Sequence, residues 1–128
     1  MEINQITGAV LDTSIEIHRR LGPGLLETVY RKILAHELRK QGFQVEEEVP
    51  IPVEWDGVRV ELGFRADIIV NAAVVVETKS IESILPVHKK QVLTHLKIMN
   101  LQVGLLINFG ETLLKTGTHR IVNNFVED

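Results

Sequence analysis

A strand–helix–strand pattern in the second half of the chain constrains the fold more than any other feature. Residues 74–79 form a short run rich in β-branched residues, and residues 103–109 are apolar almost throughout. Between them, Pro86 is well placed to begin a helix that continues to Asn100. A continuous apolar run is typical of a central strand covered on both faces, and a crossover helix sets the two strands parallel. The pattern predicts an α/β fold.

Two helices are expected before the first strand. Residues 3–21 carry apolar side chains at three-, four- and seven-residue steps, which suits a helix with one buried face. The sequence Gly-Pro-Gly at 22–24 ends that helix. A second helix is expected over residues 25–41, because its apolar positions repeat in the same way and Gly42 can terminate it.

Short strands fill the rest of the chain. Residues 49–53 alternate apolar residues with prolines, which cannot donate ladder hydrogen bonds, so this strand is expected at a sheet edge. Asp56-Gly57 is a favoured two-residue hairpin turn, and it leads into a strand over 58–70. A last edge strand is expected over 119–122, after a turn at Thr116-Gly117. The expected order is α-α-β-β-β-α-β-β, in one domain that covers residues 1–128.

Strand periodicity divides the expected strand 58–70 between two faces. One face carries Leu62, Phe64, Ala66, Ile68 and Val70, and the other carries Gly63, Arg65 and Asp67.

Composition and charge limit the partners and the location of the protein. The 128 residues have 45% hydrophobic side chains, no cysteine and a net charge of -3. Without cysteine, a metal site must use oxygen or imidazole ligands, and a cytoplasmic location is expected. The acidic balance argues against binding of nucleic acid through a large positive field. No apolar run approaches the ~20 residues of a membrane span, and the amino terminus does not resemble a signal peptide.

Three charged residues form the constellation that can carry chemistry. Glu77 and Lys79 lie two residues apart on one face of the strand 74–79, where a buried strand would ordinarily be apolar. Asp67 lies near the end of the preceding strand, and pairing across the short turn at 71–73 can bring its carboxylate beside that of Glu77. Two adjacent carboxylates repel each other unless a proton or a cation lies between them. The bare pattern fits either a metal site or a surface ion pair.

Cleavage of a phosphodiester requires the groups that this constellation supplies. Mg²⁺ or Mn²⁺ prefers hard oxygen ligands, which are expected from Asp67, Glu77 and the peptide carbonyl of Thr78. Lys79 can orient or deprotonate a water molecule and offset the negative charge that develops on the phosphate. The hypothesis is therefore a metal-dependent phosphodiesterase with Asp67, Glu77 and Lys79 as its catalytic residues.

Several motifs resemble a known family. The run Gly22-Pro23-Gly24-Leu25-Leu26-Glu27-Thr28-Val29-Tyr30 resembles the signature of the bacterial GxxExxY proteins, which Gly24, Glu27 and Tyr30 carry here. The similarity continues through Phe64-Arg65-Ala66-Asp67, Val76-Glu77-Thr78-Lys79, Leu85-Pro86-Val87-His88 and Leu105-Leu106-Ile107-Asn108-Phe109. That family is placed in the PD-(D/E)XK nuclease superfamily. The resemblance implies a restriction-endonuclease-like mixed sheet flanked by helices, a divalent-metal site, and a match of Asp67, Glu77 and Lys79 to the superfamily's Asp, Glu and Lys.

Residues on two helices are candidates for a supporting role. Glu27 lies in the first turn of the second helix, where it either complements the helix dipole or, as the resemblance implies, joins the metal site. Tyr30 lies three residues later and either hydrogen-bonds Glu27 or packs. On the later helix, His88, Gln91 and His95 share one face. Gln91 resembles the Gln of the Gln-x-x-x-Tyr element of exonuclease-like members, although His95 stands where that element has Tyr.

The sequence leaves three functions open. The first is a Mg²⁺-dependent nuclease that acts on DNA, the default substrate by analogy, with a homodimer as its assembly. The second is a nucleic-acid-binding module without catalysis. The third is an accessory subunit that binds another protein and uses the ionic cluster only to stabilise the sheet.

Overall fold

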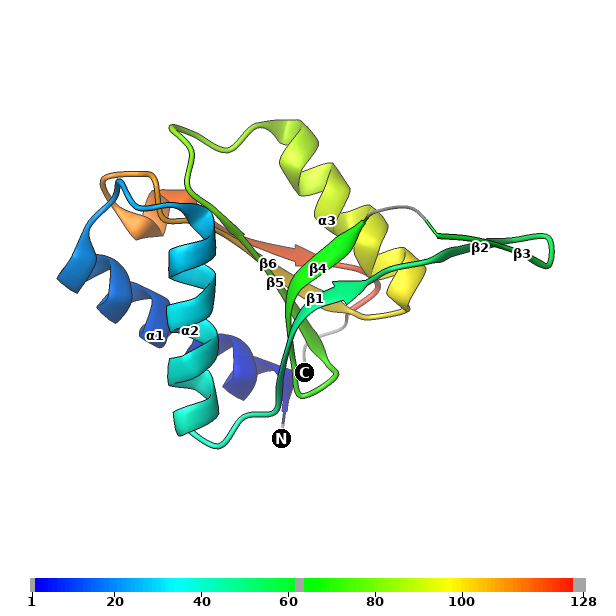
Figure 1. The fold of residues 1–128 in the computed structure, drawn as a ribbon, viewed down its shortest axis with the longest axis horizontal. Coiled ribbons are helices and arrows are strands. Elements are labelled where there is room, and N and C mark those ends of the chain that lie inside the picture. Colours follow the sequence, from blue (N-terminus) through cyan, green and yellow to red (C-terminus); the bar gives the residue numbers. More distant parts are fainter. Residues whose placement is uncertain (1, 62–63, 126–128) are drawn as a thin grey trace.

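The computed structural model of the chain describes residues 2–61 and 64–125, which form a five-stranded sheet, a separate two-stranded sheet and helices (Figure 1). The elements are α1 (Ile3–Leu21), α2 (Glu27–Lys40), β1 (Val45–Pro50), β2 (Val53–Trp55), β3 (Val58–Val60), β4 (Arg65–Val70), β5 (Val74–Lys79), α3 (Pro86–Met99), β6 (Val103–Asn108), the 3₁₀ helix η1 (Leu114–Gly117) and β7 (Thr118–Val122).

The five-stranded sheet is mixed. Its strand order is β1-β4-β5-β6-β7, in which β5 and β6 are parallel and the other neighbours are antiparallel. The prediction of a mixed sheet flanked by helices is confirmed, and so is the order α-α-β-β-β-α-β-β for the elements of this sheet and its helices. The first and last strands, β1 and β7, lie at the edges of the sheet.

The expected edge strand over residues 49–53 is wrong in its bounds, because β1 ends at Pro50 and β2 begins at Val53 in the other sheet. Proline cannot donate a ladder hydrogen bond, and Pro50 and Pro52 flank the break.

Helices cover both faces of this sheet. On one face, α1 and α2 pack against alternate residues of the central strands, among them Val74, Val76 and Leu105. On the other face, α3 packs against Val75 and Leu106. Figure 1 shows α3 on the opposite side of the sheet from α1 and α2. Because β5 is buried on both faces, whatever polar groups it carries are held between these layers. In the described part of the chain, no helix is long and apolar enough to span a membrane.

The expected strand 58–70 is divided in the structure. Its first part, β3, pairs with β2 in a separate hairpin, and its second part, β4, pairs with β1 in the main sheet. The hairpin turn lies at Asp56-Gly57 as predicted, and both residues have positive φ, 49° and 77°. Leu62 and Gly63, two residues of the predicted alternation, lie outside the described residues. The alternation could not reveal this division, because the same period continues on both sides of it.

Helix α3 lies close to the sheet because β6 has a glycine beneath it. A Cβ atom on Gly104 would lie 2.9 Å from Cγ1 of Val92, a distance that would force one of the two elements to move. The close approach brings one side of α3 over the strand end that carries Glu77 and Lys79. Val92 also lines the cavity described next.

Candidate active site

Asp67 occupies the point at which strands β4 and β5 separate. The last paired residues are Ile68 and Val76. Beyond them, the backbone N–H of Thr78 donates a hydrogen bond of 2.9 Å to Oδ2 of Asp67, and the Thr78 hydroxyl donates a second one of 3.3 Å to the same oxygen. The side chain of Asp67 thus replaces the next backbone hydrogen bond between the two strands. The carboxylate of Asp67 is fixed between the strands and close to the side chain of Glu77.

A cavity of about 290 Å³ opens on this side of the sheet, beneath α3. Asp67, Glu77 and Lys79 all line it, and they come from the ends of β4 and β5. The complete lining is Glu27, Phe64, Arg65, Asp67, Glu77, Lys79, His88, Gln91, Val92 and His95. Of the residues that the sequence singled out, the structure therefore brings all except Tyr30 and Thr78 to one cavity.

The carboxyl group of Glu77 is buried beside a second carboxyl group, and both circumstances disfavour its ionised form. Its side chain is 7% exposed, and Oε1 has no hydrogen-bond partner among the described residues. Burial and the adjacent carboxylate of Asp67 raise the pKa of Glu77 to about 9, although the Lys79 ammonium group acts in the opposite direction. Near neutral pH the pair of carboxyl groups therefore holds a proton between them.

Glu27 extends the acidic group from the first residue of α2. Burial and the carboxylate of Asp67 raise the pKa of Glu27, while the charges of Lys79 and Arg31 lower it. Glu27 is the acidic residue of the first turn of α2, directly after the N-cap residue Leu26. It lines the same cavity as Asp67 and Glu77.

The donor set fits a hard divalent cation that keeps part of its water shell. Within residues 2–61 and 64–125, no group of three or more His, Asp or Glu side chains is arranged to hold a metal ion by itself. Mg²⁺ is commonly bound by only one or two carboxylates, with water and substrate oxygens completing the octahedron. The unpartnered Oε1 of Glu77 and the raised pKa values of Glu27 and Glu77 are the features that a cation would relieve.

The family model of the PD-(D/E)XK nuclease superfamily matches the chain over residues 4–121. The chain belongs to this superfamily. No curated protein and no solved structure matches it. The match spans nearly all of the three helices and both sheets, and it includes every residue that lines the cavity.

Within this superfamily framework, Tyr30 holds a loop and lies away from the cavity. Its ring is fully buried and stacks on Phe109 at a centroid distance of 4.5 Å. Its hydroxyl donates to the carbonyl of Gly22 at 2.5 Å and accepts from the backbone N–H of Leu25 at 3.2 Å. The expected alternative of a bond to Glu27 is not seen. Tyr30 instead fixes the loop before α2 and so determines where Glu27 begins that helix.

Gly24 completes the explanation of the Gly-x-x-Glu-x-x-Tyr spacing. Its φ of 113° lies in a region that side-chain-bearing residues rarely adopt. Glycine permits the loop, Tyr30 anchors it, and Glu27 reaches the cavity. The spacing of the motif thus has a local structural reason that does not depend on the comparison.

The three polar residues of α3 lie in different environments. Gln91 is exposed at the mouth of the cavity. His88 accepts a hydrogen bond of 2.9 Å from the Leu85 backbone N–H at Nδ1, so part of its role is to cap α3. His95 is 6% exposed, contacts the ring of Phe64 and has a buried Nδ1 without a partner among the described residues. Burial and the nearby Lys79 lower the pKa of His95 to about 4, so this ring is neutral near pH 7.

Sequence reasoning missed Arg31 and Phe64 as parts of the site. Arg31 is 8% exposed and forms ion pairs with Glu48 at 2.9 Å and Glu47 at 3.7 Å, behind the acidic cluster. Its position one helical turn after Glu27 was a usable signal, because residues four apart on a helix are neighbours. Phe64 gave no signal, since its alternation assigned it to the face opposite Asp67.

Proposed function

We propose that the chain is a Mg²⁺- or Mn²⁺-dependent nuclease that hydrolyses phosphodiester bonds, with DNA as its substrate. The observation that carries this proposal is the convergence of Asp67, Glu77 and Lys79 in one cavity, where the pKa of a buried carboxyl group is raised to about 9. Membership in the PD-(D/E)XK nuclease superfamily supports the same reaction class. Perturbed carboxyl groups in a cleft are typical of functional sites.

In this proposal the chain's own residues divide the work. Asp67 and Glu77 would hold the cation, and the carbonyl of Thr78, which does not line the cavity but whose backbone N–H bonds Asp67, would be a further ligand. Glu27 would contribute either directly or through water. The bound cation supplies an acidified water molecule and charge neutralisation at the phosphate. Lys79 orients the attacking water and stabilises the charge that builds on the phosphoryl oxygens.

In the proposal, four other residues position Glu27, contact the substrate or limit the access of water to the cavity. Tyr30 places Glu27 through the loop before α2. Gln91 lies at the mouth of the cavity, where its amide can bond a substrate oxygen. The half-buried His88 lines the same cavity and has Nε2 available for a phosphate or water contact, while the neutral His95 ring excludes water from the inner wall.

The finer identity is also part of the proposal. The spacing of Gly24, Glu27 and Tyr30 supports assignment to the GxxExxY proteins within the superfamily. The chain without cysteine is consistent with a cytoplasmic protein in which residues 1–128 form one domain. Two copies per assembly would present two sites to a duplex.

A cleavage screen tests the activity. Wild type, Lys79→Met and Lys90→Met are incubated with single- and double-stranded DNA and RNA in Mg²⁺, in Mn²⁺ and in EDTA. Lys90 is the matched control, because it is exposed on α3 and does not line the cavity. We expect cation-dependent cleavage that falls roughly 100-fold or more in Lys79→Met and is unchanged in Lys90→Met. Equal activity of all three preparations would point to a contaminant and contradict the proposal.

Two measurements separate a nuclease from the other two functions, the nucleic-acid-binding module and the accessory subunit. The first is calorimetric titration with the cation, and the second is the stability of Asp67→Asn. A nucleic-acid-binding module without a metal site would give equally weak heats in wild type and Glu77→Ala. An accessory subunit would lose stability in Asp67→Asn while any activity of its complex stayed the same. A nuclease requires cation binding that both substitutions weaken.

A further inference from the structure

One side chain joins the loop before α2 to the segment that follows β5. Ser80 comes directly after Lys79, and Leu25 lies two residues before Glu27. The hydroxyl of Ser80 donates a hydrogen bond of 2.6 Å to the carbonyl oxygen of Leu25, across 55 residues of chain. Glu27 and Lys79 both line the cavity of the candidate site. The bond therefore connects the two segments that bring these side chains to the cavity.

The backbone on both sides of Ser80 is held by the end of β6 and the residue after it. The Lys79 carbonyl accepts a hydrogen bond of 2.8 Å from the backbone N–H of Phe109. The side chain of Asn108, which is fully buried, accepts from the Ile81 N–H and donates to the Ile81 carbonyl, both at 3.0 Å. Buried hydrogen bonds of this kind make the backbone rigid. Ser80 therefore presents its hydroxyl from a fixed position.

Hydrogen bonds, more than packing, hold the loop on the other side of this contact. Leu25 is 39% exposed and Leu26 is 77% exposed, so burial anchors neither side chain firmly. Leu26 is the N-cap residue of α2 and makes no capping hydrogen bond with its side chain. The Leu25 N–H donates to the Tyr30 hydroxyl at 3.2 Å, and the Leu25 carbonyl accepts from Ser80. The first bond ties the loop to the helix that follows it, and the second ties it to β5.

We propose that Ser80 is a positioning residue that fixes Glu27 relative to the end of β5 through its bond to the Leu25 carbonyl. The inference rests on the proposed function, because it concerns the role of Glu27 at the cation. Mg²⁺ demands near-ideal octahedral geometry, so the separation between the start of α2 and the end of β5 affects its binding. Groups that orient the ligands of a metal accordingly contribute to metal affinity and to activity.

Hydrogen exchange of the cation-free protein tests the contact itself. We expect the Leu25 amide to exchange severalfold faster in Ser80→Ala than in wild type, because a loop that has lost one of its two bonds opens more often. The amides of β6 should exchange as in wild type, which would show that the sheet is intact. Equal exchange of the Leu25 amide in the two proteins would refute the proposal.

Calorimetric titration with Mg²⁺ tests the effect on Glu27. Ser80→Ala should raise the dissociation constant roughly 3- to 10-fold, the factor that one hydrogen bond is typically worth. Glu27→Gln should raise it as well, and Ser80→Ala added to Glu27→Gln should then change it less than about twofold. This double-mutant cycle separates an effect through Glu27 from a general loosening of the fold. Ser80→Thr keeps the hydroxyl and should bind as wild type does.

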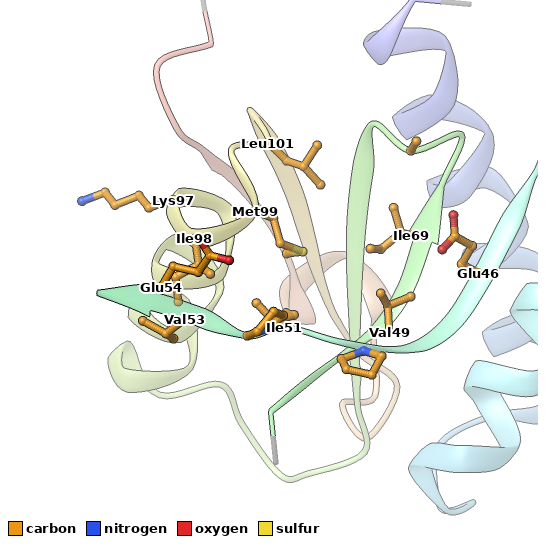
Figure 2. A pocket seen from close by; sticks show the side chains of 13 residues that line it. Glu46, Val49, Ile51, Val53, Glu54, Ile69, Lys97, Ile98, Met99 and Leu101 are labelled. Atoms are coloured by element: carbon orange, nitrogen blue, oxygen red, sulfur yellow. The ribbon is translucent and has the colours of Figure 1, made fainter. Parts of the chain in front are cut away.

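Two control variants accompany the titration. Thr13→Val removes a hydroxyl that also donates to a backbone carbonyl, that of Ala9 at 2.7 Å, but Thr13 lies on α1 and does not line the cavity. Glu54→Gln removes a carboxylate from a second cavity, a groove of about 640 Å³ between the β1–β2 segment and the end of α3 (Figure 2). Among the described residues, none lines both cavities. Neither substitution should change the dissociation constant.

Three results of the titration would overturn the proposal. One is an effect of Ser80→Ala that is equally large with and without Glu27→Gln. Another is unchanged binding in Glu27→Gln, since Glu27 would then have no role at the cation for Ser80 to support. The third is a Ser80→Thr variant that binds as weakly as Ser80→Ala.

Cleavage assays distinguish a failure of this inference from a failure of the proposed nuclease. Cleavage that Ser80→Ala leaves unchanged, at a Mg²⁺ concentration near the dissociation constant, would refute the role of Ser80 alone. Cation binding that depends on both Ser80 and Glu27, in a protein that cleaves no nucleic acid, would support that role and refute the nuclease alone. A wild type that binds no cation would refute both.

Discussion

Replacing Glu77 with glutamine should remove a pH dependence of stability that the acidic cluster creates. The folded protein holds the Glu77 proton up to a pKa of about 9, whereas the ordinary value, which applies to the unfolded chain, is 4.5. Between these values unfolding releases a proton, so the free energy of unfolding falls as the pH rises. The protonated acid and glutamine are similar in size and both can donate to Asp67, so glutamine imitates the state in which the proton is held.

The expected magnitude follows from the linkage relation. One proton released on unfolding gives a slope of about 1.4 kcal/mol per pH unit. Two histidines with lowered pKa values, His95 and His119, act in the opposite direction, because the unfolded chain binds protons that they do not. Their contribution is present above the ordinary value of 6.5 and is lost as the pH falls below it. The clean window is therefore pH 7 to 8.5, in which wild type should lose about 2 kcal/mol.

Urea unfolding followed by circular dichroism at pH 7, 7.5, 8 and 8.5 measures this slope. EDTA is present, since a bound cation would replace the proton, and the protein concentration is held fixed. Glu77→Gln should give a nearly flat profile and be more stable than wild type at pH 8.5. The control is Glu82→Gln, an exposed residue after β5, which should follow wild type. Parallel profiles for wild type and Glu77→Gln would show that Glu77 does not hold its proton, and the reasoning about the cluster would be wrong.

Two other predictions concern the cation and the loop before α2. At pH 8, Mg²⁺ at 100 times its dissociation constant should raise the free energy of unfolding of wild type by about 2.7 kcal/mol, measured by urea titration; a similar gain in Asp67→Asn would place the cation elsewhere. Tyr30→Phe should lower the free energy of unfolding by about 1–3 kcal/mol, because a buried hydroxyl that bonds Gly22 and Leu25 is lost. It should also weaken Mg²⁺ binding through Glu27, and calorimetry showing unchanged binding would limit Tyr30 to stability alone.

Much of the fold could be predicted from the sequence, because its periodic patterns agree with its turn residues. The expected helix 3–21 matches α1, and the strand 74–79 matches β5. Asp56-Gly57 marked the hairpin turn correctly, because the positive φ of both residues is a local requirement. The parallel pairing of β5 and β6 followed from the helix between them.

An irregularity in the pairing of β1 with β4 depended on tertiary structure and gave no local signal. Glu48, whose φ is 50°, lies at the register position opposite Asp67, where the β1–β4 pairing skips one residue pair. Its carboxylate pairs with Arg31 of α2, and that hydrogen bond lowers the pKa of Glu48. An irregularity held by a residue on another element cannot be read from the strand itself.

The candidate site was predictable in its strand residues and less so in its helix residues. Strand periodicity placed Glu77 and Lys79 on one face without further information, and the cavity contains both. For Glu27, the sequence left a capping role and a site role equal, because the first turn of a helix suits a carboxylate in both cases. The path of the loop before α2, which Tyr30 holds, brings Glu27 to the cavity, and no sequence pattern encodes that path.

The position of the acidic cluster explains how the fold tolerates it. Two carboxyl groups and an unpartnered oxygen at the middle of a buried strand oppose folding, since each buried polar atom without a partner is costly. In this protein they lie at the end of β5, where β4 has separated and the backbone N–H of Thr78 has already bonded Asp67. The preceding residues of β5, from Val74 to Val76, are fully buried between the helix layers and stabilise the same strand. Such a strand can keep two mutually repelling carboxyl groups at its end. A cation that binds there removes this repulsion and therefore binds more tightly.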